Sequence, residues 1–160
     1  MKSISVVLAL FSTGLMAGIF FTWTNAVKPG IGQLDDYIYL SSLQSMNREI
    51  LNPMFYFAFI LPIVSLPVSA ALNYGSHGTY DFKILLLATA IYWIGAFLVT
   101  ILGNIPLNEM LDAVDLEELK TEDWSVMRKK IEDKWNRYNL IRTLASIASF
   151  ALIIWSLLRK

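Results

Sequence analysis

The sequence predicts an all-α fold: a bundle of four transmembrane helices, with short amphipathic helices in the loops after the first and third spans. The chain has 160 residues, 56% of them hydrophobic, and its mean hydropathy is +0.52. Soluble domains contain roughly 45–50% apolar residues, so this excess favours a membrane protein. Four stretches also lack Asp, Glu, Lys and Arg, at residues 3–27, 50–80, 84–108 and 143–158.

These uncharged stretches have the length that a membrane requires. A bilayer core of about 30 Å needs about 20 helical residues at about 1.5 Å each. The fourth stretch is short, but Leu140 and Ile141 extend it, and Arg142 can pair internally or reach the interface. We therefore expect one membrane domain over residues 1–160, with spans at about 3–26, 53–73, 83–104 and 139–158.

The N-terminus has two interpretations. Lys2 followed by a long apolar stretch resembles a signal peptide. That stretch, however, exceeds the usual length of about 7–15 residues and ends in "FTWTNAVKPG", which has no small-x-small cleavage site. We expect a retained first helix, with a cleaved signal peptide as the alternative.

Two segments between the spans have the apolar spacing of helices that lie at a membrane surface. Residues 34–51 place apolar side chains roughly on one helical face, and residues 122–138 repeat them at three- and four-residue steps. Thr121 or Asp123 is a suitable N-cap for the second segment. We expect this second segment to continue directly into the last span.

Proline, glycine and asparagine mark the expected helix ends. We expect Pro29-Gly30 to interrupt the chain after the first helix, and Gly103-Asn104 to end the third. Asn52-Pro53 is expected to open the second helix, because proline is tolerated in a first turn. Pro62 and Pro67 fall inside that helix, which predicts a kink with neighbouring groups satisfying the freed carbonyls.

Composition excludes several functions. The formal net charge is zero, which gives no electrostatic reason to expect a nucleic acid as partner. The chain has no cysteine, which excludes disulfides, thiolate metal sites and iron–sulfur clusters. Its single histidine, His77, excludes a bis-histidine haem within one chain and is expected to be a turn residue. We expect no metal site and no cofactor.

Asparagine is distributed unequally between the two expected membrane faces. In a four-span topology the loops after the first and third helices share one face, and both termini share the other. Only Asn73 lies on the termini side, whereas seven of the eight asparagines lie on the loop side: Asn25, Asn47, Asn52, Asn104, Asn108, Asn136 and Asn139. Helix capping explains each asparagine singly, but the cluster favours a polar pocket at the membrane boundary.

Helical spacing sorts the candidate site residues. Gln44 and Asn47 share a face at i,i+3, and Trp135, Asn139 and Arg142 share one at i, i+4, i+7. Arg142 is expected at or just inside the membrane, where an ionisable group is costly and usually paired. The candidate catalytic residues are Asn47, Asn104, Asn108 and Arg142. The candidate substrate-binding residues are Trp23, Asn25, Gln44, Asn52, Trp135 and Asn139.

Orientation and assembly have weaker signals. The termini side carries Lys2, Lys83, Arg159 and Lys160 against one acid, Asp81. This favours cytoplasmic termini in the plasma (inner) membrane, although Lys and Arg counted over the long loops alone favour the opposite. Gly14 and Gly18 form a G-x-x-x-G that packs helix 1 within the bundle or against a second copy. The lipid bilayer and a lipophilic small molecule are the expected partners.

Four pieces of the sequence carry a family resemblance: "GIFFTWTNAVKPG" (18–30), "LQSMNREILNP" (43–53), "GNIPLNEML" (103–111) and "WNRYNLIRTLAS" (135–146). With them the chain resembles the anthrone oxygenase-like family of small four-helix membrane proteins, most of which have no assigned function. In the anthrone-oxidising members, O₂ oxidises an activated aromatic ketone to a quinone without metal or flavin. The resemblance implies a shared surface at the Asn/Arg cluster described above.

Such chemistry sets requirements for the pocket. Amide and guanidinium donors would stabilise an enolate, and Phe20, Phe21 and Met46 would hold a flat ring. Glu49 and Glu109 lie on the same side as candidate bases, with a solvated or salt-bridged surface role as the alternative for each. The alternative function is a non-catalytic membrane interaction or transporter-accessory subunit. Transport itself has least support, because no charged residue falls in the middle of a span.

Overall fold

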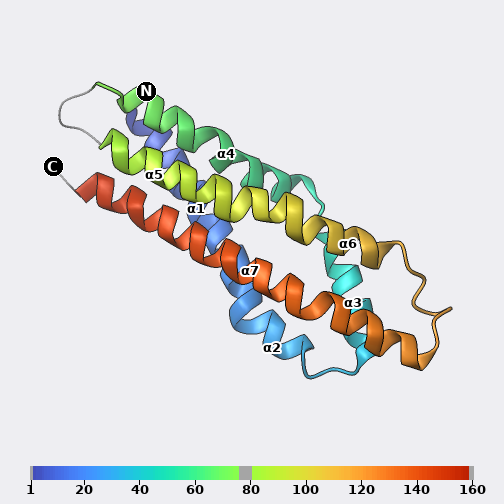
Figure 1. The fold of residues 1–160 in the computed structure, drawn as a ribbon. Coiled ribbons are helices and arrows are strands. Elements are labelled where there is room, and N and C mark those ends of the chain that lie inside the picture. The colour runs from blue at the N-terminus through green and yellow to red at the C-terminus, as the bar shows by residue number, and fades with distance from the viewer. Residues whose placement is uncertain (1, 76–80, 159–160) are drawn as a thin grey trace.

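Four long helical rods build the molecule in the computed structural model, which describes residues 2–75 and 81–158 (Figure 1). The first rod joins α1 (Lys2–Thr22), a π-helical segment η1 (Trp23–Val27) and α2 (Lys28–Ile31). The second is α4 (Pro53–Asn73), and the fourth is α7 (Thr121–Leu158). The third joins α5 (Phe82–Tyr92), the π-helical segments η2 (Trp93–Leu98) and η3 (Thr100–Asn104), and α6 (Ile105–Asp112).

All four rods are long and apolar enough to cross a membrane. The predicted all-α bundle of four transmembrane helices is therefore confirmed, and the chain is an integral membrane protein. α3 (Asp36–Glu49) is the remaining helix of the described residues. It lies beside α6 and the first half of α7, at the end of the bundle opposite the termini (Figure 1). The cytoplasmic location of the termini stays a prediction, and His77 lies outside the described residues.

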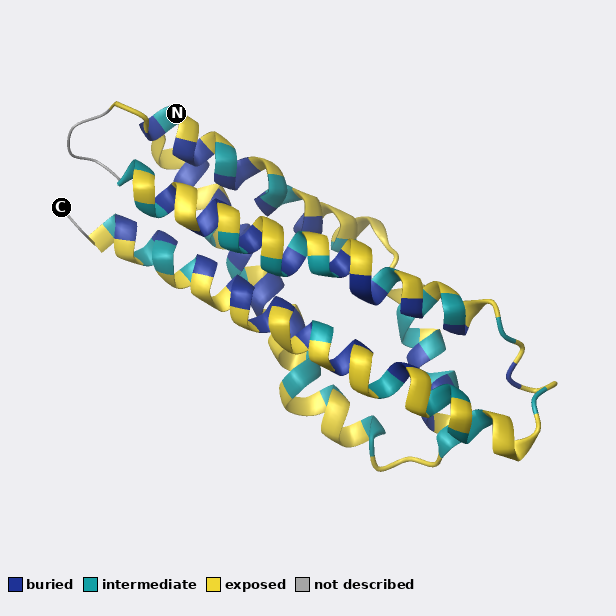
Figure 2. Cartoon of the chain, in the orientation of Figure 1, coloured by how far each residue is buried: buried dark blue, intermediate teal, exposed yellow. Residues whose placement is uncertain are grey.

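The spanning part of the bundle has an apolar interior and an apolar exterior. Its core contains Met16, Leu66, Leu85, Tyr92 and Ile153, each with no exposed surface. Residues coloured as exposed lie along the outward faces of the rods (Figure 2), and many exposed residues of the chain are large and hydrophobic. An outward apolar surface of this kind suits contact with lipid rather than water.

A second core holds the extramembrane end together. Leu40 and Leu43 of α3 pack with Leu111 of α6 and Ile131 of α7, all without exposed surface. The amide Nε2 of Gln44 donates to the backbone oxygens of Leu111 and Val114, at 2.9 and 3.1 Å. These bonds satisfy carbonyls at the end of α6, so Gln44 fastens one element to the next.

Arg128 of α7 ties the loop before α3 to the last helix. Its guanidinium donates to the backbone oxygens of Gly32 and Leu34 at 2.9 and 2.7 Å, and it pairs with the carboxylate of Asp36. Its Cζ atom lies 4.3 Å from the centre of the Tyr39 ring. Burial raises the pKa of Tyr39, so this hydroxyl stays protonated.

Two predicted helix ends are wrong. The first rod continues through Pro29-Gly30 to Ile31, and the third continues through Gly103-Asn104 to Asp112. A π-helical segment precedes each proline, so the Lys28 N–H bonds to Trp23 O and the Ile105 N–H bonds to Thr100 O. Each proline then sits in the first turn of the next α-helical segment, where its missing N–H is tolerated.

The prediction that Asn52-Pro53 opens the second helix agrees with the structure. The Asn52 side chain accepts from Phe55 N at 3.0 Å and caps α4. Both internal prolines lie within α4. Pro67 supplies no N–H for the carbonyl of Ile63, and the indole N–H of Trp93 donates to that oxygen at 3.2 Å. A neighbouring helix thus satisfies this freed carbonyl, as expected.

Candidate functional site

A cavity of about 500 Å³ lies where the spanning bundle meets the extramembrane end. Every rod and α3 contribute to its lining, and most of the lining side chains are apolar. The polar ones come from helices far apart in sequence, and they include Thr22, Asn47, Glu49, Thr100, Asn104, Asn108, Asn139 and Arg142. The combination of a mostly apolar wall with a few convergent polar groups is typical of small-molecule sites.

Two of the π-helical segments form part of the wall. Trp23 and Val27 come from η1, whereas Thr100 and Asn104 come from η3. A π-helical turn shifts the side-chain register relative to an α-helix, and such turns are frequent at functional sites. In this protein they aim an indole, a hydroxyl and an amide at one cavity.

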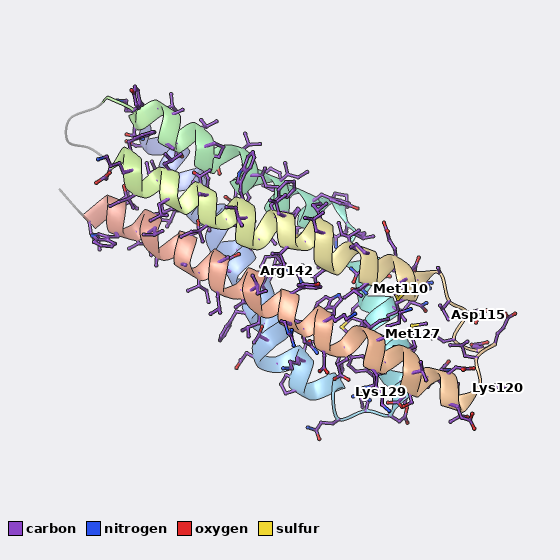
Figure 3. The ribbon with its side chains drawn as sticks, viewed as in Figure 1. Met110, Asp115, Lys120, Met127, Lys129 and Arg142 are labelled. Atoms are coloured by element: carbon purple, nitrogen blue, oxygen red, sulfur yellow. The ribbon has the colours of Figure 1, made fainter. Side chains whose placement is uncertain are left out.

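Arg142 is the charged group deepest in the bundle. It projects from α7 about midway along the molecule, well away from the loop that carries Asp115 and Lys120 (Figure 3). Only 6% of the residue is exposed. Its Nη2 atom donates to Asn139 Oδ1 at 2.9 Å, and its Nη1 atom donates to Thr100 Oγ1 at 3.4 Å.

The surroundings of Arg142 are neutral. Its Cζ atom lies 4.4 Å from the centre of the Phe20 ring and 5.3 Å from a Trp135 ring centre. Within the described residues, every ion pair involves Arg48 or Arg128, so Arg142 has no carboxylate partner there. The cation is balanced by dipoles and aromatic faces, which compensate a buried charge only in part.

Hydrogen bonds hold the tryptophans and asparagines around the cavity in place. The Trp135 indole donates to Asn108 Oδ1 at 2.6 Å, and the Trp23 indole donates to Asn136 Oδ1 at 3.0 Å. The centres of the two tryptophan rings are 4.3 Å apart. Asn139 Nδ2 donates to the backbone oxygen of Phe20 at 3.1 Å. These hydrogen bonds hold the side chains of the cavity wall in position, and none of them involves Arg142 Nε, Asn47 Nδ2 or Asn104 Oδ1.

Three buried polar atoms of the lining residues lack a partner within the described part of the chain. They are the Nε of Arg142, the Nδ2 of Asn47 and the Oδ1 of Asn104. Two are donors and one is an acceptor. Buried polar groups are usually satisfied in folded proteins. Other buried hydroxyls of the described residues, such as those of Tyr92 and Ser146, also lack a partner, so the three atoms at the cavity are candidate contacts for a polar ligand atom.

The structure gathers seven of the ten predicted site residues in the cavity lining: Trp23, Asn47, Asn104, Asn108, Trp135, Asn139 and Arg142. Three others have different places. Asn25 is exposed in η1, Gln44 binds the end of α6, and Asn52 caps α4. Of the expected aromatic and thioether walls, Phe20 and Met46 line the cavity, whereas Phe21 is 49% exposed and lies outside it. The functional roles of all these residues stay predictions.

The structure adds Thr100 to the lining, a residue that the sequence pattern does not mark as a candidate. Thr100 lies inside an apolar span, where a threonine ordinarily bonds to its own helix, as its hydroxyl also does to Ala96 O here. Glu49 also lies in the lining, whereas Glu109 does not. The two acids differ in their positions, because Glu49 is the last residue of α3 whereas Glu109 lies within α6.

Fold and site together define a small four-helix integral membrane protein with a mostly apolar cavity that has several polar side chains in its wall. The chain belongs to the anthrone oxygenase family, whose family model matches residues 53–152. That match covers α4 through most of α7, and therefore the cavity residues from Thr100 to Arg142. No curated protein and no solved structure matches the chain.

Proposed function

We propose that the cavity binds a flat, lipophilic aromatic molecule carrying an acidic oxygen, and that the protein oxidises this molecule with O₂ without a cofactor. The observation that carries the proposal is Arg142, a buried cation with no carboxylate partner in the described residues. Membership of the anthrone oxygenase family supports the reaction type.

An anion is the ligand that this arginine favours. A charge buried without an opposite charge is costly, and a negative ligand oxygen nearby offsets that cost. The same positive charge lowers the pKa of a ligand's phenol or enol and so favours the ionised form. The free Nε–H of Arg142 and the free Nδ2 of Asn47 are donors for such an oxygen.

The remaining walls suit the ring system. Phe20, Phe59 and Trp135 line the cavity, and aromatic side chains of this kind stack on flat ligands. The cavity volume of about 500 Å³ lies within the range of small-molecule sites, about 300–1,000 Å³. The unpartnered Oδ1 of Asn104 would accept from a second hydroxyl of the ligand.

The chemistry requires proton removal before oxidation. An anthrone-type ketone loses a proton from its ring methylene, and the electron pair moves onto the carbonyl oxygen as an enolate. The enolate then reduces O₂: one oxygen atom becomes the new carbonyl oxygen, the other leaves as water, and the two methylene hydrogens end in that water. Arg142 would stabilise the enolate oxygen, and Glu49, the acid in the cavity lining, would accept the first proton.

Replacing Arg142 by leucine tests the proposal. Arg142→Leu should lower anthrone-dependent O₂ consumption by about a hundredfold or more, as loss of an oxyanion donor does. Arg137→Leu is the matched control, because Arg137 lies on the same helix and is exposed. Both proteins are reconstituted in liposomes, and circular dichroism checks their helicity.

Two outcomes would contradict this proposal. Unchanged turnover in folded Arg142→Leu protein would remove the arginine from the reaction. Wild-type protein that neither binds anthrone nor consumes O₂ with it, yet recovers a membrane partner in stoichiometric amounts, would favour the non-catalytic interaction subunit instead.

A further inference from the structure

A second hollow runs along the lipid-facing side of α1. It is an open apolar groove of about 790 Å³. Phe11, Leu15 and Ile19 contribute exposed apolar walls, and Phe150 of α7 contributes the other side. The groove follows α1 from Val7 to Thr22, which is about 22 Å at about 1.5 Å per residue. That length exceeds one leaflet of a bilayer core about 30 Å thick.

The groove adjoins the cavity. Ile19 and Thr22 belong to the lining of both hollows. A molecule whose polar end lies beside Arg142 would therefore have a path past these two residues into the groove along α1. The path points toward the middle of the membrane, because α1 runs from the cavity to the end that carries the termini (Figure 1).

The two glycines of the G-x-x-x-G have different surroundings in this groove. A Cβ atom on Gly14 would meet the Phe150 ring at 3.0 Å, so packing within the chain accounts for Gly14. A Cβ atom on Gly18 would meet nothing within 4 Å. Packing within the chain therefore does not require glycine at position 18, and its missing side chain leaves the groove open where it approaches the cavity.

We propose that this groove holds the hydrocarbon tail of the ligand whose aromatic head occupies the cavity. The substrate class is then an acidic aromatic head that carries a long apolar tail. The inference rests on the proposed function for the head, and on the shared Ile19 and Thr22 for the tail. A tail in this groove would contact apolar side chains of both α1 and α7, and within lipid its binding would be favoured by van der Waals packing rather than by removal from water.

Gly18→Leu tests the tail site, with Gly30→Leu as its matched control. Gly30 is likewise a helical glycine with nothing within 4 Å of an added Cβ, but it lies in α2, away from the groove. The probes are anthrone and an anthrone bearing a long alkyl chain. Dissociation constants are measured without O₂ in nanodiscs of one lipid composition, so that partition into lipid is the same for every variant.

The expected result is a loss of selectivity for the tail. Wild-type and Gly30→Leu protein should bind the alkylated anthrone more tightly than anthrone, and Gly18→Leu should bind both alike. The affinity for anthrone itself should stay unchanged in Gly18→Leu, because the leucine would fill the groove and not the head cavity.

Three results would overturn the inference. One is that wild-type protein binds both probes with the same affinity, a result that would be consistent with the head site but would contradict a tail site in the groove. A second is an equal effect of Gly18→Leu and Gly30→Leu. The third is a wild-type dimer in native mass spectrometry that Gly18→Leu dissociates without any change in probe selectivity, because a second copy then occupies the groove. Failure of anthrone to bind at all would instead reject the proposed function of the cavity.

Discussion

Arg142 is the residue on which the proposed function depends. It receives hydrogen-bond support from Asn139 and Thr100 and lies against the faces of Phe20 and Trp135. All four neighbours are neutral, so they orient the guanidinium and leave its charge available. A carboxylate partner would have neutralised the guanidinium charge. This is the case for Arg128, also in α7, which pairs with Asp36 of α3 and with Glu132 of α7. The contrast between these two arginines supports a binding role for Arg142.

Glu49 is the candidate general base of the proposed reaction. Glu49→Gln should lower anthrone turnover by about 100- to 10,000-fold, the usual contribution of a general base, while binding of anthrone is kept. Glu109→Gln is the matched control, because Glu109 is exposed at the same end of the molecule and lies outside the cavity lining. Stopped-flow measurement of O₂ consumption and separate equilibrium binding give the two readouts. Equal turnover in the two variants would contradict a role for Glu49.

The π-helical segments are the elements that shape the site. η1 and η3 keep the first and third rods continuous past a proline, and they carry Trp23, Thr100 and Asn104 into the cavity wall. Each π turn shifts the hydrogen-bond ladder from i+4 to i+5, which rotates the following side chains. The third rod thereby continues into α6, which lies against α3.

Trp93 and Pro67 form a pair that a double-mutant cycle can test. Trp93→Phe removes the indole donor from Ile63 O and should cost about 0.5–1.5 kcal/mol of stability. In a Pro67→Ala background the restored N–H of residue 67 bonds to the same oxygen, so the tryptophan should matter less. Unfolding by SDS in bicelles measures both differences.

Trp155→Phe serves as the control for this cycle. Trp155 is 57% exposed, and its indole donates no hydrogen bond within the described residues. Its replacement should give the same stability difference with proline or alanine at position 67. Equal costs for Trp93→Phe in both backgrounds would show that the indole does not act through the freed carbonyl.

Some of these elements were predictable and others were not. The spans follow from apolar length alone, and the four-span topology alone places seven asparagines at one end. Which asparagines face the cavity depends on rotation about each helix axis, and the π segments change that rotation. The sequence around Pro29 and Gly103 predicts helix ends, but both rods continue past them through π-helical segments. A local sequence pattern does not reveal the i+5 hydrogen bonds of such segments. Asn25 and Asn52 therefore share the predicted end of the molecule but not its cavity.

At the scale of the whole molecule, the cavity lies between two differently built halves. One half is the four-helix part of the rods around the first core. The other half is built from α3 together with α6 and the first half of α7, which are the ends of the third and fourth rods, and it packs around Leu43, Leu111 and Ile131. Neither half alone encloses the site, because α3 supplies Met46 and Asn47 while the rods supply Phe20 and Arg142. Under the two proposals above, this arrangement would give a lipophilic ligand a route from the bilayer to the charged group of Arg142.

The ionisation state of a bound ligand tests the central claim most directly. Anthrone changes its absorption spectrum when it loses a proton, so spectra recorded without O₂ report its form in the cavity. Below the pKa of the free compound, wild-type protein should bind anthrone as the enolate, because Arg142 favours the charged form. Arg142→Leu protein should bind it only in neutral form or not at all. Neutral anthrone in wild-type protein, or enolate in Arg142→Leu protein, would contradict the account.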